Sequence, residues 1–140
     1  MRRFVVIATV LASVLLLAGC GPSSASLTGR MWKLTAVTVT GTGSQLPPGV
    51  VPVVDQARYT ITFNDDGTFQ AQADCNNVGG GYTTSGNSIT ITPGPSTLVA
   101  CPADSYGDAF VAALSQAASY AVGHSVLTLT TSGGDSLTFG

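Results

Sequence analysis

The chain has 140 residues, which leaves room for one domain after an export segment at its start. Only 9% of the residues are charged, there is no Glu, and the formal net charge is −2 at pH 7. A sequence without a cluster of basic residues has no surface suited to a phosphate backbone, so we expect no binding to nucleic acid.

The first 20 residues have the parts of an export signal. Arg2 and Arg3 form a short positive segment, and the uncharged run from Phe4 to Leu17 follows. This run is shorter than the roughly 20 apolar residues that a membrane-spanning helix needs. Leu17-Ala18-Gly19-Cys20 then places a branched apolar residue and two small residues before a thiol. The pattern resembles the bacterial lipoprotein signal.

That resemblance implies that residues 1–19 are a cleaved signal peptide and that Cys20 is the lipid-carrying first residue of the mature protein. Two or three acyl chains anchor a protein stably, because each buried CH₂ contributes about 0.8 kcal/mol. Residues 20–26 are then a lipidated tether and residues 27–140 the domain, with three basic residues against seven aspartates, a net charge of −4. We expect the protein at the cell membrane or outer envelope, with its domain outside the cytoplasm.

Alternation of apolar and polar residues with a period of two predicts antiparallel strands. The alternating segments are residues 59–63, 68–73, 88–92, 126–130 and 136–139. Another strand starts at Trp32, which we interpret as a core residue, and its change of phase after Ala36 predicts a β-bulge.

Turn-forming residues separate these segments. Asn64–Gly67, Ser85–Asn87 and Ser132–Asp135 have the composition of tight hairpin turns. The segment Gly41–Pro52 contains three prolines and three glycines, and we expect it to be a long loop.

One segment has the pattern of an amphipathic helix. Ser105 and Asp108 have the spacing of a capping box. A single apolar stripe follows, made of Tyr106, Phe110, Ala113, Leu114 and Ala117. We expect a helix of about 13 residues that ends near Ser119 and covers the apolar face of the sheet.

Cys75 and Cys101 are the two cysteines that remain once Cys20 is acylated. Outside the cytoplasm they should form a disulfide. A closed loop of about 26 residues would stabilise the fold by about 3.5 kcal/mol in the chain-entropy description. A redox pair or thiolate metal ligands are the less favoured interpretation, because there is no C-x-x-C motif and only one histidine.

Several short motifs occur together in a recognisable order. They are Trp32-x-Leu34, Phe63–Phe69, Cys75–Tyr82, Thr97–Pro102, and the helix segment with Phe110 and Leu114. In this order the chain resembles the META-domain family, also called HslJ-like, of bacterial envelope proteins, over about residues 27–139. Asp74 departs from the family pattern, which usually has a small residue there, and Gly79–Gly81 is more flexible than the usual segment.

The resemblance implies an α+β fold: a compact, mainly antiparallel β domain, barrel-like or strongly curved, packed with one helix. It also implies a loose association with heat shock, envelope stress, antibiotic tolerance or motility, but it does not imply a catalytic activity. We therefore expect a monomeric, non-enzymatic protein without a cofactor or a metal. Its membrane contact is the lipid on Cys20, and an envelope protein or a small ligand is a possible partner.

Residues that could carry chemistry are few. His124 is the only histidine, and any general-base mechanism would depend on it, but an exposed turn is the better interpretation. Asp65 and Asp66 could suggest a calcium loop, although a hairpin turn explains the pair more simply.

Possible partner-binding residues lie in two places. Asn76 and Asn77 could bind a ligand, and a strand-end turn is the favoured alternative. Pro47, Pro48 and Val50 belong to the Gly41–Pro52 segment, which could act as the surface loop of an inhibitor of a cell-wall or secreted hydrolase. This inhibitor hypothesis is the main alternative to a binding or envelope-stress role, and an enzyme dependent on His124 is the third hypothesis.

Overall fold

The computed structural model describes residues 25–41, 44–46 and 49–140. Its strands, in chain order, are β1 (Met31–Val39), β2 (Gly49–Pro52), β3 (Tyr59–Phe63), β4 (Thr68–Ala73), β5 (Asn76–Ser85), β6 (Ser88–Ser96), β7 (Ala117–Val122), β8 (Leu127–Thr131) and β9 (Ser136–Phe139). A short 3₁₀ helix, η1 (Gln56–Arg58), precedes β3, and the helix α1 (Gly107–Ser115) lies between β6 and β7.

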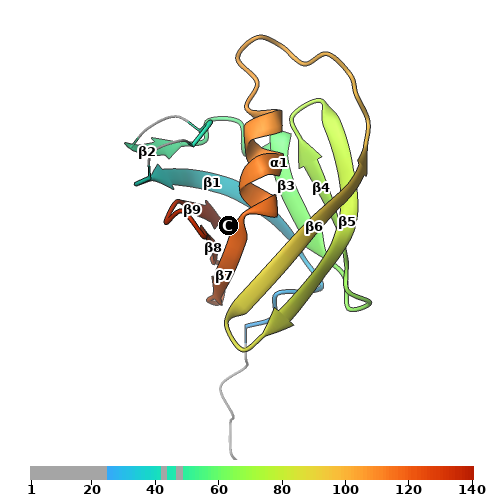
Figure 1. Cartoon of the computed structure of the whole chain (residues 1–140), viewed down its shortest axis with the longest axis vertical. Helices are drawn as coiled ribbons and strands as arrows, with labels where there is room; N and C mark the ends of the chain where they lie inside the picture. Colours follow the sequence, from blue (N-terminus) through green and yellow to red (C-terminus); the bar gives the residue numbers. More distant parts are fainter. Residues whose placement is uncertain (1–24, 42–43, 47–48) are drawn as a thin grey trace, which may run out of the picture.

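The sheet closes on itself into a barrel. The strand order is β2-β1-β3-β4-β5-β6-β7-β8-β9, the pairings between these strands are antiparallel, and β1 also pairs with β9. Strand β2 lies outside the closed ring, against the second half of β1 (Figure 1). The α+β fold with a barrel-like antiparallel sheet and one helix is therefore confirmed.

Helix α1 packs against β6 and β4 and leads directly into β7 (Figure 1). Strands β6 and β7 pair only through Ser88 and Ser119. The helix therefore covers the barrel at the point where hydrogen bonding between neighbouring strands is sparsest.

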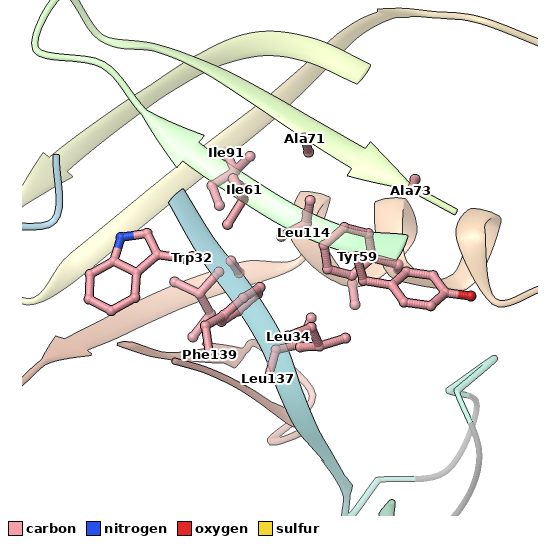
Figure 2. Close-up of a cluster of buried hydrophobic side chains, with 14 of the residues drawn as sticks. Trp32, Leu34, Tyr59, Ile61, Ala71, Ala73, Ile91, Leu114, Leu137 and Phe139 are labelled. Carbon is pink, nitrogen blue, oxygen red and sulfur yellow. The ribbon is translucent and has the colours of Figure 1, made fainter. Parts of the chain in front are cut away.

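The core fills the barrel interior with side chains from most strands and from α1, and Figure 2 shows those of β1, β3, β9 and α1 meeting there. The largest fully buried side chains are Trp32, Ile61, Phe63, Phe69, Phe110, Leu114, Leu127, Leu129, Leu137 and Phe139. The Trp32 indole nitrogen donates a 2.8 Å hydrogen bond to the Leu27 carbonyl, so this buried ring keeps its polar atom satisfied. Trp32 is thus a core residue, as predicted.

The predicted turns and bulge are also confirmed. Tight turns join β3 to β4, β5 to β6 and β8 to β9 at the three predicted segments. In the first of them Gly67 has a φ of 81°, a conformation that glycine adopts without steric cost. The register between β1 and β9 shifts between Leu34 and Ala36, close to the predicted bulge.

The end of the helix differs from the sequence prediction. The helix ends at Ser115 rather than near Ser119, and Ala117–Val122 forms β7. Alanine favours a helix, but pairing of this segment with β8 supplies the hydrogen bonds that complete the barrel, and tertiary pairing outweighs local propensity.

At the helix start, the Ser105 hydroxyl accepts a hydrogen bond from the Gly107 amide. The side-chain hydrogen bonds of the described residues include none from Asp108, so the reciprocal half of the predicted capping box is not formed.

The Gly41–Pro52 segment is not a loop throughout, because Gly49–Pro52 forms β2. Its backbone pairs with β1, with Val50 opposite Thr38 and Val51 opposite Val37. The β-branched valines suit this extended edge position, and Pro52 is tolerated because it lies at the end of an edge strand.

Glycine 80 marks a close approach between β5 and β6. The register between these strands shifts between Val78 and Gly80, and a Cβ atom at Gly80 would lie within 3.0 Å of backbone atoms of β6 and of the Phe69 ring. At Gly79 the nearest atom would be 3.8 Å away, an ordinary contact. All three residues of Gly79–Gly81 lie inside the strand β5.

We expect Gly80→Ala to lower the free energy of unfolding by at least about 2 kcal/mol, because the new methyl group overpacks against backbone that has little room to move. Urea denaturation followed by Trp32 fluorescence measures this loss. Gly79→Ala is the matched control and should change the stability by less than about 1 kcal/mol. Equal losses for the two variants would contradict the close approach.

Candidate binding cavity

A cavity of about 430 Å³ opens beside the start of α1. Its walls come from β1, from the segment between Val53 and Tyr59, and from the residues that lead into α1. The volume lies within the range of pockets that hold small ligands. A second, smaller pocket of about 250 Å³ lies beside Asn76 and Cys101.

The floor of the cavity is apolar and buried. Leu34, Val37, Leu46, Tyr59 and Phe110 form it. The rings of Tyr59 and Phe110 meet edge to face, with their centroids 5.6 Å apart. In Figure 2 the Tyr59 side chain lies beside α1 with its hydroxyl pointing away from Trp32. That hydroxyl accepts a 3.0 Å hydrogen bond from the Tyr106 amide and so positions the segment that enters the helix.

The rim of the cavity carries an ion pair. Arg58 Nε donates to Asp74 Oδ1 at 2.7 Å, and Arg58 Nη2 donates to Asp74 Oδ2 at 2.6 Å. Asp74 is buried, with 6% of its side chain exposed, and Arg58 is 29% exposed. The Asp104 carboxylate lies 3.8 Å from Arg58 Nη1, too far for a hydrogen bond. The two hydrogen bonds between Arg58 and Asp74 make a bidentate contact, which is the strong form of an arginine–carboxylate interaction.

The ion pair shifts the titration of both partners. The hydrogen bonds from Arg58 hold the pKa of the Asp74 carboxyl below its usual value, against the opposing effect of burial. The same bonds raise the pKa of Arg58. Asp74 is therefore ionised at neutral pH, and the positive charge of Arg58 is already engaged.

Asp74 also has a special backbone conformation, with a φ of 60°. Only glycine adopts this left-handed region freely, but Asp and Asn tolerate it. Asp74, which stands where the family usually has a small residue, is thus a buried ionic anchor in the β4–β5 turn. Nothing in the sequence pairs Asp74 with Arg58, because the two residues are 16 positions apart and belong to no spacing motif.

Next to this anchor, a disulfide joins Cys75 and Cys101, whose Cα atoms are 5.5 Å apart. The predicted pairing is therefore present. It connects the β4–β5 turn to the segment between β6 and α1.

The Asn76 side chain reinforces this connection. Its Oδ1 accepts hydrogen bonds from the Val99 amide at 2.8 Å and the Thr97 hydroxyl at 3.0 Å, and its Nδ2 donates to the Val99 carbonyl at 3.0 Å. Asn77 is exposed, and its amide donates to the Thr97 hydroxyl. Both residues belong to β5 rather than to a turn, which corrects the favoured interpretation of the pair. Asn76 holds the chain in place, since its polar atoms are used internally.

The remaining candidate residues lie apart from the cavity. Pro47 and Pro48 lie outside the described residues. Val50 belongs to β2, which does not pair with the strand of Asn76 and Asn77, so the structure does not gather the predicted partner-binding residues into one site.

His124 and the aspartate pair lie in turns, as expected. His124 is exposed between β7 and β8, where its carbonyl accepts a hydrogen bond from Arg30. Asp66 Oδ1 accepts hydrogen bonds from the Thr68 hydroxyl and amide, which lower the pKa of Asp66 and close the β3–β4 turn. Across the described ranges, no three His, Cys, Asp or Glu side chains are grouped so that they could hold a metal.

A comparison with models of protein families agrees with the order of the motifs. The sequence model of the META domain matches residues 25–140. The chain belongs to the META-domain family. Among curated proteins, none matches this META domain.

Two solved structures resemble this META domain. A protein from Burkholderia xenovorans, solved by NMR, has 22% sequence identity and a TM-score of 0.63, covering 95% of this chain and 97% of its own. A crystal structure of a DUF4847 family protein from Bacteroides vulgatus has 19% identity and a TM-score of 0.56, covering 81% and 92% respectively. At these identities the likeness shows the fold alone.

We expect Asp74→Asn to lower the free energy of unfolding at pH 7 by about 1–3 kcal/mol, because it removes a hydrogen-bonded charge from a buried pair. Asn tolerates the positive φ, so the turn itself is kept. Since the folded-state pKa of Asp74 is lowered, its contribution is complete above the unfolded-state pKa of about 3.9 and is lost as the pH falls through the folded-state pKa.

Urea denaturation of both proteins at pH 7, 5, 4 and 3 measures this dependence. The stability difference should be constant between pH 7 and 5 and should shrink below about pH 4. Asp65→Asn, at an exposed turn position, is the control and should leave the stability nearly unchanged. A difference that stays the same down to pH 3 would show that the contact is not ionic.

Proposed function

We propose that this META-domain protein is anchored by lipid in the cell envelope and binds a partner or ligand without catalysing a reaction. The observation that carries the proposal is the segment Leu17-Ala18-Gly19-Cys20, which ends a few residues before the META domain. A cysteine in this setting resembles the acylated residue of bacterial lipoproteins. The signal lies in residues 1–24, outside the described part of the structure.

The disulfide supports a location outside the cytoplasm. Cys75 is exposed to solvent, and its bond to Cys101 would be open to cytosolic reductants. Disulfides of this kind persist in oxidising compartments. Within the described residues, no helix is both long enough and apolar enough to cross a membrane, and in this proposal the membrane contact is the lipid on Cys20.

The chemistry of the cavity supports binding rather than catalysis. Arg58 is engaged by Asp74, and the described lining of the cavity includes no histidine, cysteine or serine. Its two free carboxylates, Asp55 and Asp104, are exposed to solvent. His124 lies in an exposed turn and does not line the cavity. An apolar cavity with a few fixed polar groups is the usual form of a ligand site. We propose a monomer whose ligand is a small molecule or part of an envelope protein.

A second candidate function is inhibition of a cell-wall or secreted hydrolase. The segment that favours it is the one after β6 rather than the predicted Gly41–Pro52 loop. The segment after β6 exposes Leu98 by 95% and Val99 by 59%. Asn76 and the disulfide hold this segment in place, so its apolar side chains are presented without a large ordering cost on binding. The Gly41–Pro52 segment is less suited to this role, because half of its described residues pair with β1 as β2.

We expect the wild-type protein, produced in a bacterial host fed an alkyne-tagged palmitate, to carry the tag and to fractionate with membranes. Cys20→Ala removes the thiol that is acylated, so the tag and the membrane association should both be lost. In-gel fluorescence and immunoblotting of membrane and soluble fractions measure the two outcomes. The double variant Cys75→Ala/Cys101→Ala keeps Cys20 and should remain tagged. A wild-type protein without the tag, or a tagged Cys20→Ala protein, would overturn the anchor.

A further inference from the structure

We propose that the cavity beside α1 takes a ligand that combines an apolar group with a positive charge. This inference rests on the proposed binding function and gives that function a ligand class.

The apolar part of the ligand follows from the floor of the cavity. Leu34, Tyr59 and Phe110 line the floor, where Leu34 and Tyr59 keep 3% and 6% of their surface accessible and Phe110 keeps none. At the rim, Val54 is fully exposed and Tyr106 is 47% exposed. Apolar side chains therefore continue from the exposed rim to the floor, and a ligand would remove mainly the surface of the rim from water.

The positive charge follows from the ionic groups. Arg58 is the one cation among the described lining residues, and Asp74 engages it through two hydrogen bonds. The other charged lining residues are Asp55 and Asp104, both exposed. Of these two, only Asp104 has a basic side chain within 4 Å among the described residues, with Arg58 Nη1 3.8 Å away. Negative charge therefore exceeds positive charge at the rim.

An anionic ligand is disfavoured by the same groups. It would have to compete with Asp74 for the guanidinium of Arg58 and would face the carboxylates of Asp55 and Asp104. A cation placed at the rim would instead meet two carboxylates that have spare acceptor capacity. The excess of aspartates over basic residues in the domain also attracts cations over a longer range.

The walls are held before any ligand arrives. The Tyr106 amide is bonded to the Tyr59 hydroxyl, and the Arg58–Asp74 pair fixes the segment that precedes β3. Binding to a site formed in advance avoids the cost of ordering loops. Figure 1 places the start of α1 at the end of the domain opposite residues 25–30, so the cavity lies away from the side where the tether would join.

The test uses three probes with one apolar part and different charges: 4-phenylbutylamine, 4-phenylbutanol and 4-phenylbutyrate. Isothermal titration calorimetry at pH 7 and low salt is carried out on the whole mature chain, residues 20–140, carrying Cys20→Ala in place of the lipid. We expect the amine to bind about tenfold more tightly than the acid, with the alcohol between them. Binding of the acid equal to or tighter than that of the amine, or no binding of the amine at millimolar concentration, would overturn the inference.

Two sets of variants locate the binding. Asp55→Asn/Asp104→Asn should reduce the preference for amine over acid to about onefold while leaving the alcohol unchanged. Val53→Trp fills the cavity from a half-buried wall position and should abolish binding of all three probes. Val126→Trp, a similar change at an exposed position that does not line the cavity, is its matched control and should bind as before. Unchanged binding in Val53→Trp would place the ligand elsewhere and overturn the assignment.

This result is separate from the test of the anchor. The palmitate experiment decides whether the protein is lipidated, and it does not depend on any ligand. A protein that is tagged on Cys20 but ignores the amine would keep its envelope location and lose the proposed ligand class.

Discussion

Strand β1 is the element on which the rest of the domain depends. It pairs with β9 along one edge, while its other edge is divided between β3 and β2. The bulge between Leu34 and Ala36 lets one strand serve both halves, because it turns the strand without interrupting the sheet. Leu34 and Val37, on either side of this irregularity, both line the cavity. The closure of the barrel and the shape of the cavity beside α1 therefore both depend on β1.

A second group of contacts gathers around the β4–β5 turn. Asp74 anchors Arg58, its neighbour Cys75 is bonded to Cys101, and the next residue, Asn76, holds Val99. Three consecutive residues thus secure two separate segments, one before β3 and one before α1. These segments carry few backbone pairs of their own, so ionic, covalent and side-chain hydrogen bonds take the place of a sheet. Both segments form walls of the cavity, which ties the candidate site to this short turn.

Much of the fold follows from the sequence because its signals are local. Alternating residues around a turn such as Asn64–Gly67 specify a hairpin without reference to the rest of the chain. The end of α1 could not be predicted in this way, since Ala117 and its neighbours favour a helix and become a strand only because β8 lies beside them. The cavity and the Arg58–Asp74 pair also could not be predicted from the sequence, because they form only where segments far apart in the chain meet.

The pairing of β1 with β9 joins residues about 100 positions apart, with Leu34 opposite Phe139. Contacts between such distant segments form slowly, since a long stretch of chain must be ordered before they contribute any stability. During synthesis the hairpins from β3 to β6 can form early, but the ring stays open until residue 139 has been made. The topology thus delays completion of the domain until the chain is nearly whole.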